Sequence, residues 1–211
     1  PLLLSSAASD VYKRQTMTDY HPGLEGVIAT KSSISDINGE KGILSYRGYS
    51  IEELAEKSTF EETAFLLLTG ELPTPDELTK FTKQINARRD LPSGMIDLLK
   101  TLPKESNPMD VIQLAVSSLG TFYPVSFDAE DLKAKKYTKD YYIEVSAGIL
   151  GSIGSIVAAW NRIKNNKDYI KPDPNLSYAD NFMHMLDDSI EVTPLISRII
   201  DATSVSYTHL T

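Results

Sequence analysis

Apolar residues recur about every 3.6 positions along most of the chain after its first quarter, which predicts helices. Several of these segments begin with a Ser or Thr that is followed three residues later by Glu, the spacing of a capping box. Thr74-Pro75 places proline at a first helical position, and Gly70 stands at a stop. The pattern therefore predicts short helices joined by tight loops, with start signals at Ser50, Thr59, Thr74, Pro92, Asn107 and Ser177.

One longer periodic segment runs from Thr138 to Asn165 and contains three glycines. A glycine inside a helix costs about 1 kcal/mol relative to alanine, so three of them need compensation. Close approach of another helix to the flank without side chains would supply it. We therefore expect a long, buried, central helix, with glycines at Gly148, Gly151 and Gly154 and apolar positions at Tyr142, Val145, Ile149, Ile153, Ile156, Trp160 and Ile163.

The segment before the helices has features that are typical of strands. Residues 26–30 (GVIAT) are rich in β-forming residues, residues 34–37 (ISDI) alternate, and residues 43–46 (ILSY) follow. Asn38-Gly39 lies between the last two, and both residues accept positive φ, which predicts a hairpin turn. The expected fold is mainly all-α, a multi-helix domain with a small N-terminal β-hairpin.

Both ends of the chain depart from this pattern. The segments SSAASDVYKRQ and SVSYTHLT resemble translated sequencing-adapter strings, and PLLL lacks the basic residues and the length of a secretory signal. We therefore predict artefactual tails at residues 1–16 and 204–211 and interpret residues 17–203 as the N-terminal part of a helical domain. Ordinary disordered tails are the alternative.

Composition narrows the classes of function. The sequence has 211 residues, of which 41% are hydrophobic and 24% charged, as in a folded globular protein. Its formal net charge of −8 argues against sequence-independent binding to nucleic acid. It has no cysteine, which excludes disulfides and thiolate metal sites and fits a reducing cytoplasm. The most apolar stretch, Ala147 to Trp160, is too short and too polar for a membrane span, so we expect a cytoplasmic protein without membrane contact.

Candidate catalytic residues are few. The histidines are His21, His184 and His209, and their settings favour surface positions over roles as ligands or bases. The sequence contains no phosphate-binding loop, no nucleophile motif and no metal-binding spacing. We therefore assign no catalytic, cofactor-binding or metal-binding residue from the pattern alone.

Two further positions carry charge at the ends of predicted elements. Asp187-Asp188 are adjacent acids at a helix end, and such side chains usually point apart into water. Arg47 stands where a strand gives way to a helix N-terminus, a place that favours anions. Arg47 is thus a weak candidate for contact with an anionic substrate, and a structural ion pair is the alternative.

Several stretches resemble bacterial citrate synthase, in order and at family-like spacing. They are GLEGVIATKSSIS, GILSYRGYSIEELAEKSTFEETAFLLLTGELPT, NPMDVIQLAVSSLG, IVAAWNRI and NFMHML. The stretch from Arg47-Gly48-Tyr49 to Leu72-Pro73-Thr74 is the most specific, and 2-methylcitrate synthase shares it. The resemblance covers nearly all of residues 17–203 and is expected to end at about Thr203.

The resemblance implies an all-helical homodimer or higher homo-oligomer whose large and small domains close over the substrate. In the implied reaction acetyl-CoA, a co-substrate and not a covalently bound cofactor, condenses with oxaloacetate, and hydrolysis then releases citrate and CoA. An Asp base and two His residues carry that reaction in the family. The segments that supply them follow the position of Thr203, so we expect an N-terminal fragment that is inactive by itself.

Two alternatives stay open. A 2-methylcitrate synthase would use propionyl-CoA, and turnover of that acyl donor by the complete protein would identify it. A stand-alone helical interaction module would be monodisperse and would unfold cooperatively. A fragment would instead expose apolar surface and aggregate.

A long sequencing read of the source DNA across the codons for Ile200 to Thr211 tests the interpretation of the C-terminal segment. We expect the reading frame to continue after Thr203 into a segment like His-Ala-Asp-His. A stop codon directly after Thr211 in the organism itself would contradict the enzyme hypothesis and favour the interaction module.

Overall fold

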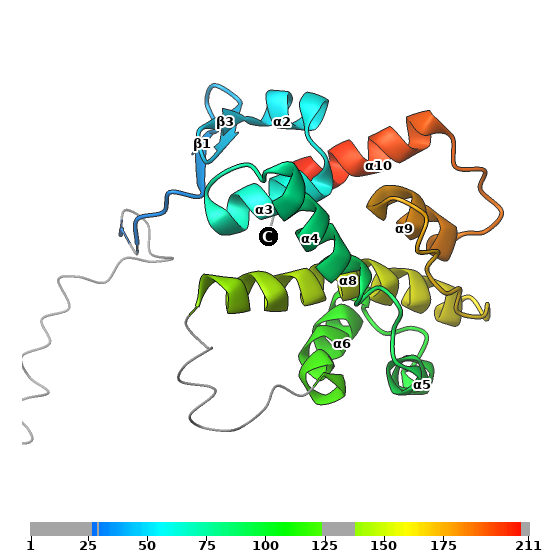
Figure 1. The fold of residues 1–211 in the computed structure, drawn as a ribbon. Helices are drawn as coiled ribbons and strands as arrows, with labels where there is room; N and C mark the ends of the chain where they lie inside the picture. The colour runs from blue at the N-terminus through cyan, green and yellow to red at the C-terminus, as the bar shows by residue number, and fades with distance from the viewer. Residues whose placement is uncertain (1–26, 29, 124–137, 208–211) are drawn as a thin grey trace, which may run out of the picture. The chain divides into compact units, whose positions relative to one another are not determined.

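The computed structural model describes residues 27, 28, 30–123 and 138–207. The chain divides into two units, residues 1–33 and residues 34–211. Every described helix and strand lies in the second unit (Figure 1). This unit is mainly α-helical and carries one small antiparallel sheet, so the fold class expected from the sequence is confirmed.

A three-stranded antiparallel sheet precedes the helices, with the strand order β1-β2-β3. Tyr46 pairs with Tyr49 across a two-residue turn. That turn consists of Arg47 (φ 50°) and Gly48 (φ 91°), and two positive φ angles are what a type I′ hairpin requires. The strands are β1 (Ser35–Asn38), β2 (Ile43–Tyr46) and β3 (Tyr49–Ser50).

The predicted hairpin exists, but two details of the prediction are wrong. Asn38 pairs with Ile43, and in the connection between them the positive φ, of 63°, is at Gly42 instead of Asn38-Gly39. In the predicted strand at residues 26–30, the described residues 27, 28 and 30 form no strand. A strand needs a neighbouring backbone for its hydrogen bonds, and the described sheet consists of β1, β2 and β3.

Each of the six predicted start signals precedes a helix, and side-chain capping bonds form at all of them except Pro92. Thr59 and Thr74 form complete capping boxes with Glu62 and Glu77. Gly70 takes a left-handed φ of 97° at the end of α3, which only glycine adopts without strain. The short helices are α2 (Ile51–Lys57), α3 (Phe60–Thr69), α4 (Pro75–Asn86), α5 (Ser93–Thr101), α6 (Pro108–Phe122) and α9 (Tyr178–Leu186).

The long helix α8 (Lys139–Lys164) packs against α4, α5, α6 and α9 (Figure 1). A Cβ atom added to Gly151 would lie 2.2 Å from the carbonyl oxygen of Ile85, so the predicted close approach of another helix is confirmed. The expectation that α8 is buried throughout is wrong for its first turns. Tyr142 and Val145 are exposed there, because the helices that pack on α8 do not cover this side of it.

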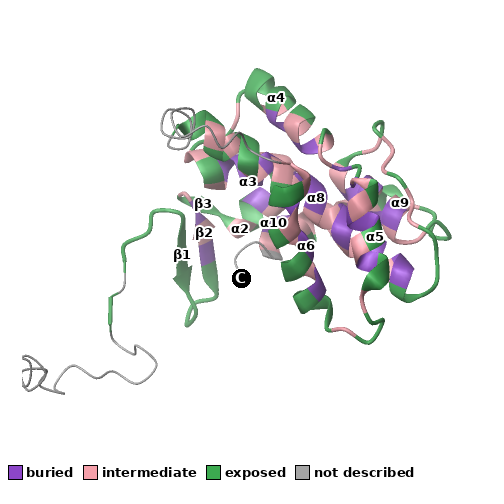
Figure 2. Ribbon diagram, turned by 90° about the horizontal axis from the view of Figure 1, so that it is seen from below, coloured by how far each residue is buried: buried purple, intermediate pink, exposed green. Residues whose placement is uncertain are grey.

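The C-terminal part of α8 forms an apolar cluster with α5 and α6. Trp160, the single tryptophan of the sequence, is 3% exposed in this cluster. By length and composition alone, α8 is the one helix among the described residues that passes as a membrane span. A packed core helix of a soluble protein passes the same test, so this result is weak evidence for a membrane span. Figure 2 shows that the buried residues lie on the faces of the helices that are turned toward one another.

A second apolar cluster joins β2, α2, α3 and the last helix, α10 (Pro194–Tyr207). Val205 is fully buried in it. Residues 204–207, which we assigned to a predicted artefactual tail at residues 204–211, are helical and belong to α10. Ser204 and Ser206 donate their hydroxyl groups to carbonyls of the preceding turn, at 2.8 and 3.1 Å, so these polar residues remain compatible with the helix. The origin of the terminal segments stays a prediction.

The substitution Gly151→Ala is expected to lower the free energy of unfolding by about 1–3 kcal/mol, because its methyl group would overlap a backbone carbonyl. The control Gly120→Ala in α6 adds a methyl group with nothing within 4 Å, and it is expected to raise that free energy by about 0.5–1 kcal/mol. Urea unfolding followed by circular dichroism measures both. A Gly151→Ala protein as stable as the Gly120→Ala protein would contradict the close packing of α4 on α8.

Candidate functional site

A cleft of about 680 Å³ lies between the start of α3, the helix α9 and the helix α10. This volume is within the range of about 300–1,000 Å³ that is typical of small-molecule sites. Apolar side chains, including Ile190 and Val192, line part of the wall. We call it the α3–α10 cleft, and its ionisable lining residues are Glu61, Tyr178, Asp180, His184, Asp187, Asp188, Arg198 and Asp201.

Arg198 joins α10 to the end of α2. Its guanidinium group donates hydrogen bonds to the carbonyl oxygens of Ala55, Glu56 and Ser58. A helix C-terminus leaves such carbonyls without partners within the helix. The same group forms an ion pair with Asp201 at 3.0 Å. Both terminal nitrogens of Arg198 are therefore engaged in holding α2.

Asp201 joins the same helix to the start of α3. One carboxylate oxygen accepts the backbone N–H of Phe60, the first residue of α3, at 3.0 Å. The other oxygen accepts from Arg198. A carboxylate at a helix N-terminus satisfies a backbone donor and interacts favourably with the helix dipole. The pair of residues thus fixes the position of α10 against the bend between α2 and α3.

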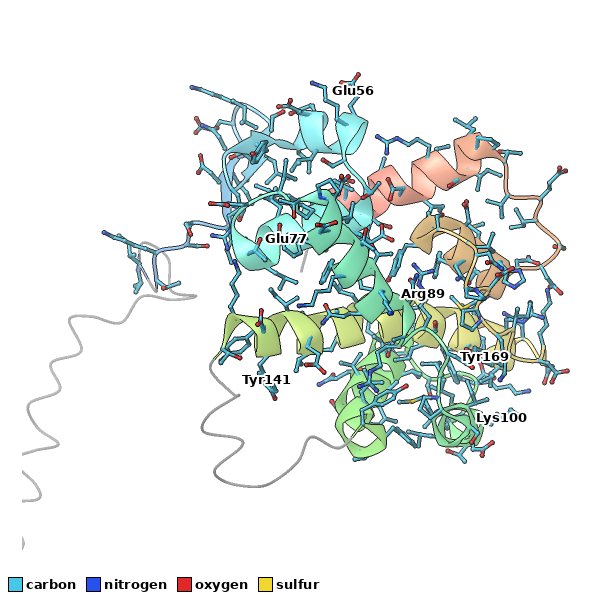
Figure 3. The ribbon with its side chains drawn as sticks, in the orientation of Figure 1. Glu56, Glu77, Arg89, Lys100, Tyr141 and Tyr169 are labelled. Atoms are coloured by element: carbon cyan, nitrogen blue, oxygen red, sulfur yellow. The ribbon has the colours of Figure 1, made fainter. Side chains whose placement is uncertain are left out.

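Glu61 lies in the first turn of α3 and pairs with Arg89, with 3.8 Å between the charged atoms. Arg89, which is labelled in Figure 3, is buried among the helices. It is 4% exposed and also donates to the carbonyl of Leu176 at 3.2 Å. Its guanidinium lies 5.2 Å from the centre of the Tyr178 ring. Burial raises the pKa of Glu61, and the attraction of Arg89 offsets this only in part. Burial also raises the pKa of Tyr178 to about 12.

The sequence candidates His184, Asp187 and Asp188 all line the cleft. Asp188 pairs with Arg162 at 2.9 Å, and this hydrogen bond lowers the pKa of its carboxyl group. Asp187 accepts the hydroxyl group of Ser189 at 2.7 Å, which lowers its pKa as well. The two acids therefore bind different partners and do not act as one carboxylate pair. His184 is half-buried in the wall of the same cleft.

Arg47, the candidate for contact with an anion, lies in the β2–β3 turn and not in this cleft. Its guanidinium donates to the carbonyl of Leu67 at 2.9 Å, near the end of α3. This contact anchors the sheet to α3, and contact with an anion stays a prediction. His21 and His209 lie outside the described residues.

Sequence reasoning missed Glu61, Arg198 and Asp201, which line the cleft, and Arg89, which pairs with Glu61. The spacing of Arg198 and Asp201, three apart on one helix, was the available signal. In residues 27, 28, 30–123 and 138–207, no group of three His, Asp or Glu side chains is arranged to hold a metal ion. The contacts of the charged residues fix helix positions, and a cleft of this size could admit a small molecule.

The chain matches a protein-family model described as "Citrate synthase, C-terminal domain" over residues 23–209. This match extends past Thr203, where we expected the family pattern to end. Over 185 residues the chain is 40% identical to the citrate synthase of Acidithiobacillus ferridurans, covering 87% of this chain and 47% of that protein. Over 164 residues it is 37% identical to 2-methylcitrate synthase 1 of Corynebacterium glutamicum, covering 78% and 41%.

Solved structures show the same similarity. The citrate synthase of Pyrobaculum aerophilum superposes with a TM-score of 0.76 at 34% identity, covering 87% of this chain and 46% of that one. The citrate synthase of Thermotoga maritima gives a TM-score of 0.69 at 34% identity, covering 87% and 45%. The chain thus spans about half the length of the proteins it matches.

The substitution Asp201→Ala is expected to lower the free energy of unfolding by about 1–3 kcal/mol, because the Phe60 N–H loses its acceptor and Arg198 its partner. Asp201→Asn keeps an acceptor oxygen and is expected to lose less. Urea unfolding compares the two variants. Equal losses would mean that the hydrogen bond to α3 contributes nothing beyond the ion pair.

Glu61 gives stability a defined pH dependence. Its folded-state pKa is raised above the unfolded value of about 4.5, so its protonated form favours folding. This contribution is complete below the unfolded pKa and is lost as the pH rises through the folded pKa. Urea unfolding at several pH values is expected to show this decline in the parent protein and not in Glu61→Gln.

Glu77 supplies a control of opposite sign. The hydrogen bond from the Thr74 backbone N–H lowers its pKa, so its contribution is present above the unfolded pKa and is lost as the pH falls. Glu77→Gln is therefore expected to remove stability at neutral pH. A Glu61→Gln protein with the same pH profile as Glu77→Gln would contradict the assigned effect of burial on Glu61.

Proposed function

The chain belongs to the citrate synthase family, and we propose that it forms the N-terminal scaffold of an enzyme that condenses acetyl-CoA with oxaloacetate and water to give citrate and CoA. The observation that carries the proposal is the identity with the Acidithiobacillus ferridurans citrate synthase along most of this chain. The citrate synthase family is an acyltransferase family. Acetyl-CoA enters as a co-substrate, and the reaction takes place in the cytoplasm.

In this proposal the chain holds the helices in place, and the side chains that react come from other parts of the enzyme. Crossing of α4 and α8 at Gly151 sets the arrangement of the central helices. Arg198 and Asp201 then fix α10 to α2 and α3, so any segment that follows α10 starts from a defined point. A proton-abstracting base and its hydrogen-bond donors need positions accurate to a fraction of an ångström. A rigid set of helices meets that need.

A second candidate is 2-methylcitrate synthase, which would use propionyl-CoA. The similarity to 2-methylcitrate synthase 1 of Corynebacterium glutamicum favours it, because that protein matches nearly as well as the citrate synthases do. A non-catalytic helical interaction module is the third candidate. The apolar residues exposed on α6 and α8 are compatible with it, since such surfaces mark contacts between proteins.

We propose that the same surface supports a homodimer or a higher homo-oligomer. Tyr142, Val145 and Ile149 lie at helical spacing along the exposed side of α8 and are 53%, 39% and 39% exposed. Met109 and Leu114 of the neighbouring helix α6 are 66% and 42% exposed. Exposed apolar residues on two helices that pack against each other are suited to contact with the same residues of a second copy.

An assay of CoA release tests the proposed reaction. The complete gene product of the source organism is expected to release CoA from acetyl-CoA only when oxaloacetate is present, and the 211-residue chain is expected to release none. Propionyl-CoA assayed in parallel identifies a 2-methylcitrate synthase. A complete product without turnover of either acyl-CoA, together with a sharp reversible melt of residues 17–203 alone, would favour the interaction module.

The substitution Val145→Lys is expected to shift the protein from dimer to monomer in size-exclusion chromatography with light scattering, because a buried ammonium group without a partner is costly. Ala87→Lys adds the same charge at an exposed position at the end of α4 and is expected to leave the dimer unchanged. If both variants had the same mass distribution as the parent protein, the contact between copies would not involve Val145.

A further inference from the structure

Asn38-Gly39 is the only Asn-Gly pair in the sequence, and no function described above uses it. Asn38 ends strand β1, and Gly39 begins the connection to β2. Both residues are exposed. Apart from its two chain neighbours, no heavy atom lies within 4 Å of the place where a Cβ of Gly39 would stand, so the space beside this residue is open.

The side-chain amide of Asn38 is held by one hydrogen bond. Its oxygen accepts the backbone N–H of Lys41 at 3.0 Å. A donor on an amide oxygen withdraws electrons from the carbonyl carbon and favours attack on that carbon by a nucleophile. The nearest backbone nucleophile in the sequence is the nitrogen of Gly39, which has no side chain to shield it.

Strand β1 is an edge strand with few buried contacts. All four of its residues are exposed, and in the described sheet it pairs with β2. In β2, by contrast, Leu44 and Tyr46 are buried in the core cluster with α2, α3 and α10. Edge segments with few buried contacts open at low free energy, so Asn38 can reach the conformation needed for ring closure without unfolding of the helices.

None of the other seven asparagines is followed by glycine, and four of them show further obstacles to this chemistry. Asn107 precedes proline, which has no N–H to act as a nucleophile. Asn181 is 1% exposed, and both ends of its side-chain amide are hydrogen-bonded. Asn161 lies within α8, and Asn175 precedes a leucine whose side chain hinders approach. The combination of exposure, a following glycine and an activating donor occurs at Asn38.

We propose that Asn38 is a site of spontaneous modification, at which the side-chain amide is converted to aspartate and isoaspartate. The Gly39 nitrogen attacks the Asn38 side-chain carbonyl carbon, a C–N bond forms, and the amide nitrogen leaves as ammonia with the proton from Gly39. Water then opens the five-membered imide at either carbonyl. The sum is asparagine plus water giving aspartate or isoaspartate plus ammonia, without oxidation or reduction.

The modification changes both charge and backbone length in the hairpin. A carboxylate makes the formal net charge of −8 more negative by one. Isoaspartate also inserts a methylene group into the main chain, so the pairing of Asn38 with Ile43 is disrupted. The sheet then keeps β2, whose Leu44 and Tyr46 are buried in the core cluster.

Peptide mapping of the purified 211-residue protein during incubation at neutral pH tests the proposal. The tryptic peptide Ser32–Lys41 contains Asn38 as its only asparagine. We expect its mass to rise by the difference between an amide and an acid, with isoaspartate detected by enzymatic methylation. The peptide that carries Asn175 is expected to change severalfold more slowly.

Two variants serve as controls. Gly39→Ala adds a methyl group in open space at a residue without positive φ, so it is expected to preserve the fold and slow the conversion severalfold. Asn38→Asp adds the charge without lengthening the backbone, so hydrogen exchange of β1 should accelerate in isoaspartate-containing protein and not in this variant. Conversion at an equal rate in Gly39→Ala, or faster at Asn175 than at Asn38, would overturn the proposal.

Discussion

The contact between the carbonyl of Ile85 and the flank of Gly151 is the constraint on which the rest of the helical arrangement depends. Apolar side chains alone allow two helices to slide by fractions of a turn, whereas a backbone group that fills the place of a side chain fits one register. The next residue, Ser152, donates its hydroxyl group to the carbonyl of Arg88 at 3.1 Å. The end of α4 is therefore fixed on α8, and Arg89 follows from that point toward Glu61 and Leu176.

Charged side chains extend this order from the central helices to the bend between α2 and α3. Arg198 supplies a positive group to the carbonyl end of α2, and Asp201 supplies a negative group to the amide end of α3. Each charge thus opposes the partial charge of the helix end that it contacts. Because both residues come from one helix, the positions of three helices are determined together.

The elements that the sequence predicts well are those defined by contacts between near neighbours. Thr59 and Glu62 are three residues apart, and their reciprocal hydrogen bonds do not require any tertiary contact. The hairpin shows the limit of such signals. Asn38-Gly39 favours a turn with positive φ at these two residues. Burial of Leu44 and Tyr46 sets the register of β2, and the positive φ of the connection is at Gly42. Arg47 at positive φ gave no local signal for the second turn.

The charged part of the cleft escapes prediction because its partners are far apart in the sequence. Arg198 and the carbonyl of Ser58 are separated by 140 positions, and no local pattern at either end indicates the other. The burial of Val205 could not be predicted for a related reason. The residues around it are Ser and Thr, which give no helical apolar pattern, and its apolar partners come from β2, α2 and α3. His184, a candidate chosen by residue type alone, lines the cleft but takes no part in the ion pairs described there.

Because Trp160 is the single tryptophan of the sequence, tryptophan fluorescence reports on only one part of the molecule. Trp160 lies in the cluster of α5, α6 and α8, whereas β2, α2, α3 and α10 form a separate cluster without tryptophan. Indole emission responds to the water around the ring, so it follows the opening of the first cluster only. Backbone ellipticity sums over all helices. Disagreement between the two signals would therefore identify the end of the molecule that loosens first.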